Sequence, residues 1–215
     1  MIETAAGLVL RTRPLTETSL IIHWLTPNLG RLATVAKGAR RPKSPFAGKL
    51  DLFYAADFSF SRSRTSELHA LREVKLCETH AAIRDDIIKL QQAAYVANFI
   101  TQATETETPL QDIYALLDSF LELLCRDKPQ PQNVLAMELK LLGELGMEPD
   151  MSESNLTPGA RKIAFALLEG DWATLSRLKL SDAQVGELGQ WLHGFLIFHL
   201  GHLPRGRTSA LSDTN

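Results

Sequence analysis

The pattern of apolar and polar positions changes near residue 80. Before it, short apolar and β-branched segments are separated by proline, glycine and polar turns, which is typical of strands. After it, apolar positions recur at steps of three and four, which indicates helices. We expect the five strands over residues 7–13, 19–26, 31–37, 50–60 and 68–76.

Five short strands with one long loop after the third suit a small closed barrel, and the OB-fold is the first candidate. The periodicity alone does not distinguish it from an SH3-like barrel or a small sandwich. We therefore predict an α+β protein of two domains. Residues 1–80 would form a five-stranded OB-fold that binds nucleic acid, and residues 81–215 an all-α domain that binds proteins.

The helical half contains start and stop signals. A first helix is expected with a buried face that includes Ile83 and Ile87. The segments 108–111 (TPLQ) and 181–184 (SDAQ) both have the spacing of a capping box, in which two side chains satisfy backbone N–H groups at the start of a helix. Residues 208–215 are polar, and we expect them to fray.

Charge is divided unevenly along the chain. The 215 residues carry a net charge of only −2, yet the first 75 carry +6 and the rest −8. A basic half suits a polyanion such as nucleic acid. A membrane is a poorer partner, because the basic residues fall among strands and no apolar run has the length of a spanning helix. The N-terminus lacks the pattern of a secretory signal, so we expect a cytoplasmic protein.

The basic residues are concentrated in the loop after the third strand. Residues 30–44 read GRLATVAKGARRPKS, and no acidic residue falls between Lys37 and Lys49. A solvated surface is the plain interpretation, but loops between strands often carry positioned binding residues. We expect the loop to bind phosphate, with Phe46 exposed for stacking on a base. The predicted DNA-binding residues are Arg31, Lys37, Arg40, Arg41, Lys43, Phe46, Lys49, Arg62 and Arg64.

Catalytic and metal-binding motifs are missing from the sequence. The phosphate-binding loop motif, the HExxH motif and the nucleophile elbow are all absent. Cys77 with His80, and His199 with His202, each offer two ligands, fewer than a zinc site requires. We therefore expect no enzymatic activity, no metal and no cofactor.

Several segments together resemble the RecO family of bacterial recombination mediators. They read GLVLRTRPLTETSLIIHWLT, GRLATVAKGARRPKS followed by AGKLDLFYAADFSF, ELHALREVKL, LKLLGELGMEPD and LIFHLGHL. The resemblance implies an OB-fold followed by a helical domain. It also implies a non-enzymatic, nucleoid-associated repair factor that binds single- and double-stranded DNA and anneals complementary strands.

The same resemblance implies protein partners. With RecR, the protein would help to load RecA on DNA coated by single-strand-binding protein, and RecF is a further candidate partner. The acidic C-terminal tail of the coating protein would dock on the helical domain. Candidate residues for receiving this tail are Arg161, Lys162, Arg205 and Arg207.

The chain departs from the family at one motif. Many members carry a four-cysteine zinc motif after the segment that matches LLGELGMEPD, whereas here the chain reads MSESNLTPGARKI. We therefore predict a loop without zinc, and stoichiometric zinc in the purified protein would refute this prediction. A different class of function also remains open, namely a protein-interaction module whose basic loop is merely solvated and whose barrel docks a partner subunit.

Overall fold

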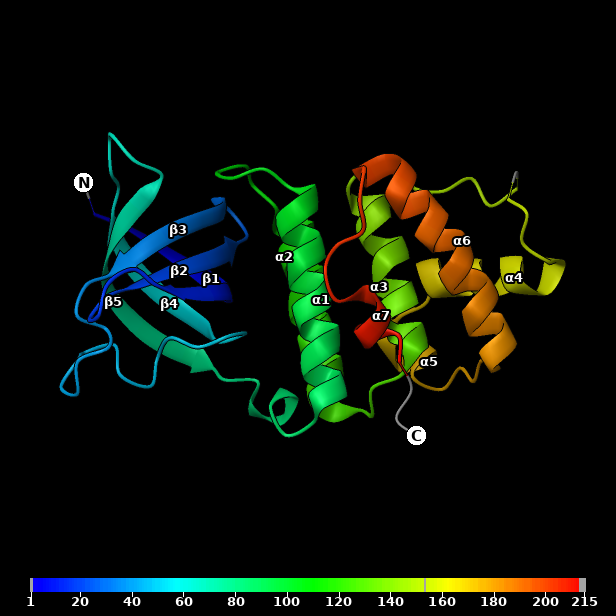
Figure 1. Ribbon diagram of the computed structural model, residues 1–215, viewed down its shortest axis with the longest axis horizontal. Helices are drawn as coiled ribbons and strands as arrows, with labels where there is room; N and C mark the ends of the chain where they lie inside the picture. Colours follow the sequence, from blue (N-terminus) through cyan, green and yellow to red (C-terminus); the bar gives the residue numbers. More distant parts are fainter. Residues whose placement is uncertain (1, 153, 213–215) are drawn as a thin grey trace. The chain divides into compact units, whose positions relative to one another are not determined.

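The computed structural model describes residues 2–152 and 154–212. It contains a closed five-stranded barrel followed along the chain by helices (Figure 1), which confirms the predicted α+β class. Contacts between Cα atoms divide the chain into two compact units. One comprises the chain as far as Ala81 together with Thr104–Asp118, and the other comprises Ala82–Ala103 and the chain from Ser119 onward. A functional division after residue 80 stays a prediction.

The strands close in the order β1-β2-β3-β5-β4, with β4 pairing back to β1. Neighbouring strands are antiparallel except β3 and β5, which are parallel. This is the topology of the OB-fold, and it decides among the three architectures that the sequence allowed. The strands are β1 (Ile2–Pro14), β2 (Leu20–Thr26), β3 (Gly30–Ala36), β4 (Ala55–Ser61) and β5 (Leu68–Glu78).

Aromatic side chains fill the barrel. The rings of Trp24 and Phe58 stack with their centroids 4.1 Å apart, and both side chains are buried. The indole N–H of Trp24 donates to Thr34 Oγ1 at 2.8 Å, so the one polar group of this ring is satisfied inside the core. Alternate residues of β3 face the same interior, which is the strand period that the sequence showed.

The fourth strand is shorter than predicted, since it begins at Ala55 and not at residue 50. Phe53 has a positive φ of 62°, a conformation that interrupts an extended strand. Its backbone N–H donates to Val9 O at 2.8 Å, and its carbonyl accepts from Nδ1 of His80 at 2.7 Å. The apolar residues before β4 therefore pack as part of a loop.

Helix α3 is the most buried helix of the helical unit. Nearly all of α3 is buried, and it packs against α1, α4 and α6. The short helix η1 covers Ala81–Ile83, and the others are α1 (Ile87–Ala103), α2 (Gln111–Arg126), α3 (Pro131–Glu144), α4 (Pro158–Glu169), α5 (Trp172–Leu175), α6 (Asp182–Leu200) and α7 (Arg207–Ala210).

Local capping signals predicted one helix start and missed another. Ser181 and Gln184 form both hydrogen bonds of the capping box at the start of α6, as predicted. The box predicted at residues 108–111 is wrong, because α2 begins only at Gln111. The backbone N–H of Leu110 donates to Pro27 O at 3.1 Å, so this segment lies against the β2–β3 turn.

The buried face predicted for the first helix is also wrong at its start. Ile87 is 63% exposed, and Ile83 belongs to the separate helix η1. The side chain of Asp86 accepts the backbone N–H of Ile88 at 2.8 Å and so caps the start of α1. Helix α1 therefore begins at Ile87, later than the apolar spacing indicated.

The polar C-terminal segment is ordered where the structure describes it. Residues 207–210 form α7, and Arg207 is buried. The prediction of a frayed end over residues 208–212 is therefore wrong, and residues 213–215 lie outside the described residues. The reason is a partner far away in sequence, Glu138, which forms an ion pair with Arg207.

Candidate nucleic-acid interface

The loop between β3 and β4 is folded as a series of tight turns. Backbone hydrogen bonds run from Arg41 N to Gly38 O, from Ser44 N to Arg41 O and from Lys49 N to Phe46 O, at 3.0 to 3.1 Å. Gly38 has a φ of 71°, a turn conformation that glycine adopts without strain. The loop is therefore internally held, and its side chains project from a defined backbone.

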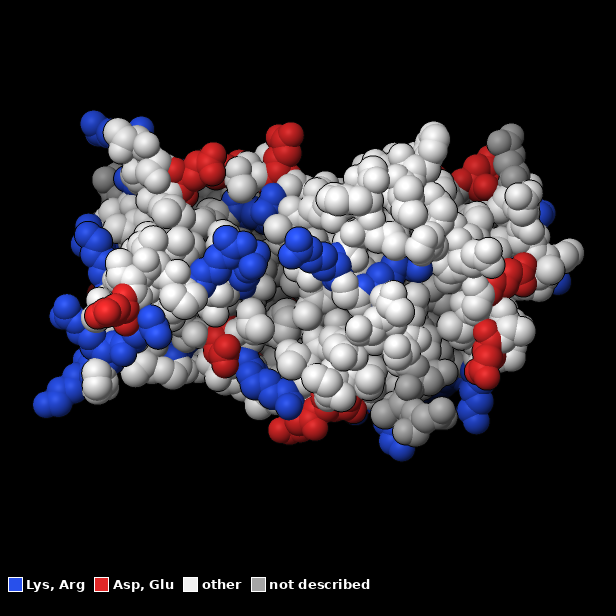
Figure 2. Space-filling view, viewed as in Figure 1, with Lys and Arg blue, Asp and Glu red and all other residues white. Residues whose placement is uncertain are grey.

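Among the residues that the structure describes, no carboxylate neutralises the five cations of this loop. Lys37, Arg40, Arg41 and Lys43 are exposed, and Lys49 is partly exposed. No ion pair joins any of the five to an acidic residue within the described ranges 2–152 and 154–212. Figure 2 shows Lys and Arg side chains gathered at the left, where Figure 1 draws this loop. These five predicted site residues lie on one loop.

The β3–β4 loop is attached to the β1–β2 loop. The backbone N–H of Arg40 donates to Thr18 O at 3.0 Å, and its guanidinium Nη1 donates to Thr16 O at 3.1 Å. The end of β1 lies at this same end of the barrel, because Pro14 pairs with Leu20 and Leu20 pairs with Ala36. Cations at the end of β1 therefore belong to the same basic surface.

Sequence reasoning missed two such cations. Arg11 and Arg13 are exposed, and on β1 they pair with His23 and Ile21 of β2. The pKa of His23 is lowered, first by burial and then by the charges of Arg13, Arg11 and Arg31. Residues at alternate positions of a strand point to the same face, so the spacing of Arg11 and Arg13 in the sequence could have predicted a basic face on β1.

Arg31 lies apart from the basic loop. It stands near the start of β3, whereas the loop follows the end of that strand. Its guanidinium Nε donates to Thr104 Oγ1 at 2.8 Å, and Nη2 donates to Thr104 O. Burial lowers the pKa of Arg31. The structure therefore does not bring this predicted site residue together with the loop cations.

Arg62, on the β4–β5 loop, is paired with two carboxylates. Its Nε lies 2.8 Å from Glu3 Oε1, and its Nη1 lies 2.8 Å from Glu107 Oε2. These hydrogen bonds lower the pKa of Glu3 and raise that of Arg62, since each charge favours the other. Arg64 on the same loop is exposed. Of the two cations predicted here, Arg64 is exposed, whereas Arg62 is partly exposed and paired with carboxylates.

Phe46 is not exposed, and this expectation is wrong. Its side chain is 7% exposed and belongs to the hydrophobic core cluster that includes Trp24 and Phe58. The ring anchors the basic loop on the barrel, which explains why an apolar residue lies among the cations. A base could not stack on Phe46 unless the ring left this core.

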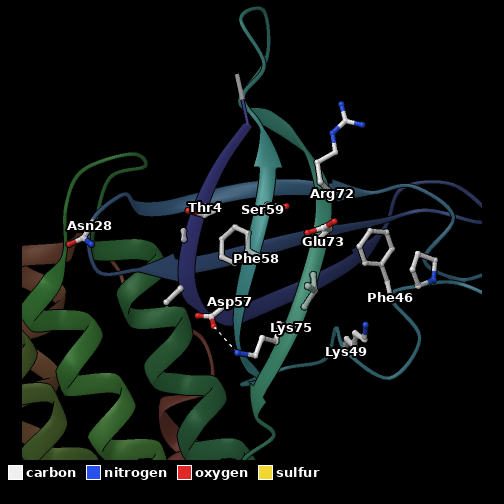
Figure 3. A pocket seen from close by; sticks show the side chains of 14 residues that line it. Thr4, Asn28, Phe46, Lys49, Asp57, Phe58, Ser59, Arg72, Glu73 and Lys75 are labelled. Carbon is white, nitrogen blue, oxygen red and sulfur yellow. Dashed lines mark ion pairs between the residues drawn. The ribbon is translucent and has the colours of Figure 1, made fainter.

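An open cavity of about 730 Å³ lies beside Phe46 on the barrel (Figure 3). Strands β1, β4 and β5 line it, and Lys49, Arg72 and Lys75 lie among the lining residues. Lys75 is also 3.9 Å from the carboxylate of Asp57, so the charges around the cavity are mixed. The cavity is less basic than the loop beside it.

The helical unit offers three accessible cations among the four predicted to receive an acidic tail. Lys162 and Arg205 are exposed, and Arg161 is partly exposed, with Nη2 donating to Ser154 O at 3.3 Å. The expectation that Arg207 is accessible to a partner is wrong, because this residue is 6% exposed and its Nε lies 2.7 Å from the carboxylate of Glu138. A partner could not reach this guanidinium without unpacking α7.

The described residues provide neither a cluster of metal ligands nor a helix that could span a membrane. Within residues 2–152 and 154–212, no group of three or more His, Cys, Asp and Glu side chains could hold a metal ion. Among the same residues, none of the helices combines the length and the apolar character needed to cross a membrane.

Comparisons with known proteins match both halves of the chain. The family "Recombination protein O N terminal" matches residues 1–80, and "Recombination protein O C terminal" matches residues 84–157. Proteins named DNA repair protein RecO are similar over most of the chain. That of Rhodopirellula baltica is 30% identical over 143 residues, 66% of this chain and 53% of the relative.

Two further relatives give the same result. The DNA repair protein RecO of Exiguobacterium sibiricum is 32% identical over 152 residues, 71% of this chain and 60% of the relative. That of Bacillus subtilis is 28% identical over 152 residues, 71% of this chain and 59% of the relative. The matched region thus spans somewhat more than half the length of these relatives. With both family descriptions matched in order along an OB-fold barrel and a helical region, the chain belongs to the RecO family.

Proposed function

We propose that this protein is a DNA-binding recombination mediator. It binds single- and double-stranded DNA through the basic end of its barrel and anneals complementary strands. The observation that carries this proposal is the set of loop cations, Lys37, Arg40, Arg41, Lys43 and Lys49, which have no carboxylate partner among the described residues. Accessible cations that carry no carboxylate partner among the described residues, on a loop held by its own backbone hydrogen bonds, can neutralise phosphates with little loss of conformational freedom.

Annealing follows from the same charges. Two strands repel each other through their phosphates, and a basic surface that neutralises part of this charge lets them approach. No covalent bond is made or broken, so the proposed activity is not enzymatic and needs no cofactor. Arg13, at the same end of the barrel, extends the surface beyond the loop, and Arg64 is a further exposed cation on the β4–β5 loop.

The proposed partners follow from membership of the family. The protein would act with RecR, and with RecF as a further candidate, to load RecA on DNA coated by single-strand-binding protein. The acidic tail of the coating protein would meet the accessible cations of the helical unit, Arg161, Lys162 and Arg205. We propose a cytoplasmic, nucleoid-associated location for this activity.

The test is fluorescence anisotropy of a labelled single-stranded oligonucleotide across a salt series. We compare wild type with Arg40→Ala/Arg41→Ala/Lys43→Ala. The matched control is Lys128→Ala/Arg177→Ala/Lys179→Ala, which removes three exposed cations from the helical unit and gives the same net charge. On single strands each neutralised phosphate adds about −0.7 to the log–log slope, so losing three contacts should flatten the slope by about 2.

The loop variant should lose affinity and slope, whereas the control should resemble wild type. Equal losses in both variants would mean that net charge alone governs binding. Binding that neither variant changes would place the DNA site elsewhere. No salt-dependent binding by wild type would favour the alternative, a protein-interaction module whose barrel docks a partner subunit.

A further inference from the structure

The carboxylate of Glu107 bridges two donors on the barrel. Its Oε2 accepts from Arg62 Nη1 at 2.8 Å, and its Oε1 lies 2.8 Å from His69 Nε2. Glu107 precedes α2 in the sequence, whereas Arg62 and His69 come from the β4–β5 loop and β5. One carboxylate thus holds a guanidinium and an imidazole at the same time.

The imidazole presents a donor to this carboxylate. The backbone N–H of Ser63 donates to His69 Nδ1 at 3.2 Å, so Nδ1 is the acceptor and Nε2 carries the proton. His69 is 2% exposed. With Arg62 beside it, this buried N–H forms a two-donor site for one anionic group.

The segment that carries Glu107 does not need this side chain to stay on the barrel. Arg31 holds Thr104 through its guanidinium, and the Arg31 carbonyl accepts the backbone N–H of Glu107 at 2.8 Å. Further along, the N–H of Leu110 donates to Pro27 O. These contacts together attach residues 104–110, here called the strap, to the β2–β3 turn and the start of β3.

The backbone at Glu107 is strained. Its φ of 57° lies in the left-handed region, which costs a residue with a side chain about 1 kcal/mol or more. Because other contacts attach the strap, attachment alone does not explain a glutamate at this position. The side chain is 45% exposed, so it can leave the site without unfolding its surroundings.

Charge at this point of the surface disfavours a polyanion while Glu107 is bound. Arg62 contributes one positive charge, and Glu3 and Glu107 contribute two negative ones. Without Glu107, Arg62 would still be paired with Glu3 and would have Nη1 available. Two oxygens of a phosphate can accept from a guanidinium and an imidazole N–H, as the two oxygens of this carboxylate do.

We propose that Arg62 and His69 form a binding site for a backbone phosphate of nucleic acid, and that the carboxylate of Glu107 occupies it until a phosphate displaces it. This inference rests on the proposed function, because it requires that the barrel binds nucleic acid. The site lies near the start of β3, apart from the loop cations, and Arg64 on the adjoining β4–β5 loop is exposed. Displacement exchanges one anion for another, so the donors remain satisfied in both states.

The test compares Glu107→Gln with wild type in the same oligonucleotide assay. Glutamine keeps an oxygen that can accept the N–H of His69, but it removes the charge that pairs with Arg62. The matched control is Glu67→Gln, an exposed residue of the same β4–β5 loop. A third variant, Glu107→Gln/Arg62→Ala, removes the proposed phosphate donor, and Arg62→Ala alone is its reference.

Glu107→Gln should bind single-stranded DNA about three- to tenfold more tightly than wild type, with a log–log salt slope steeper by about 0.7. Glu67→Gln should change affinity much less. In the Arg62→Ala background the gain should vanish. Thermal unfolding of each variant shows whether the strap and barrel are intact.

Equal gains from Glu107→Gln and Glu67→Gln, or a gain that persists without Arg62, would overturn the proposal in favour of general electrostatics. Unchanged affinity in Glu107→Gln would overturn it while leaving the basic loop as the DNA site. No binding by wild type or by any variant would overturn both this inference and the proposed function.

Discussion

Arg207 and Glu138, which lie far apart in the sequence, form a buried ion pair in the helical unit. Nε and Nη2 of Arg207 donate to the two carboxylate oxygens of Glu138 at 2.7 and 2.8 Å, and the hydroxyl of Tyr95 donates to the same carboxylate. Burial and the charge of Glu138 raise the pKa of Tyr95, so its hydroxyl keeps its proton. The pair fixes α7 against α1 and α3.

We expect Arg207→Met to lower the free energy of unfolding by about 3 to 5 kcal/mol, because Glu138 would stay buried without a counter-charge. Chemical denaturation measures this change. Arg205→Met, which alters an exposed neighbour, serves as the control and should be nearly neutral. Adding Glu138→Leu to Arg207→Met should recover much of the loss. A stable Arg207→Met single variant would contradict this account.

Gly30→Ala should destabilise the barrel more than Gly48→Ala. Both glycines have a positive φ, 65° and 72°, so each substitution by alanine has the same backbone cost of about 1 kcal/mol. A Cβ on Gly30 would lie 1.8 Å from the carbonyl oxygen of Thr108 in the strap, whereas a Cβ on Gly48 meets nothing within 4 Å. We expect a loss of about 3 kcal/mol or more at Gly30 in thermal or chemical unfolding. Equal losses would mean that the strap does not press on Gly30.

His23 predicts a dependence of DNA affinity on pH. In the folded protein the pKa of His23 lies below 6.5, the value of an unperturbed histidine. Its contribution to the free energy of unfolding is therefore fully present above pH 6.5, and it is lost as the pH falls through the folded pKa. A phosphate bound near Arg11 and Arg13 would raise this pKa, so binding would take up a proton. Affinity for single-stranded DNA should therefore increase as the pH is lowered from about 7.5 to about 5.5.

The measurement is anisotropy at constant ionic strength, with His23→Gln as the comparison. This variant should show a flatter dependence on pH, because glutamine does not titrate. If both proteins respond to pH alike, the bound DNA does not lie on the face of β1 and β2 that carries His23.

Phe46 is predicted to act on stability and not on DNA contacts. Phe46→Ala should lower the free energy of unfolding by about 3 kcal/mol, as expected for a buried ring. The salt slope for DNA binding by the folded variant should stay close to wild type, because no cation is removed. A fully stable variant with much weaker binding would instead mean that the ring contacts a base.

The fold could be predicted from sequence wherever the signal was local. Strand alternation before residue 80 and the capping box at Ser181 and Gln184 each depend on neighbouring residues, and both appear in the structure. The predicted start of β4 was too early because Phe53 has a left-handed backbone conformation, which the spacing of apolar residues does not reveal. The helix start predicted at residues 108–111 was wrong because this segment binds the β2–β3 turn, which lies far away in the sequence.

The candidate site was predictable in its charge and less so in its pairing. The run of cations from Lys37 to Lys49 is visible in the sequence, and the structure leaves these side chains without carboxylate partners among the described residues. Arg31 binds Thr104 of the strap, and Arg62 binds both Glu3 and Glu107, so each partner lies more than forty positions away in the sequence. No local pattern shows which cation a distant residue will engage.

The strap also bears on the order in which the chain folds during synthesis. The first unit is not continuous, because residues 104–118 join it after α1 has been made. While the ribosome adds residues from the N-terminus, all five strands emerge before the segment that holds Arg31 and covers His69. A nascent barrel therefore lacks the strap's contacts to Arg31, Arg62 and His69 for the time needed to translate α1. The strand pairings that close the barrel can therefore form first, and the partners of Arg31 and His69 in the strap are added only after the first helix of the other unit has been made.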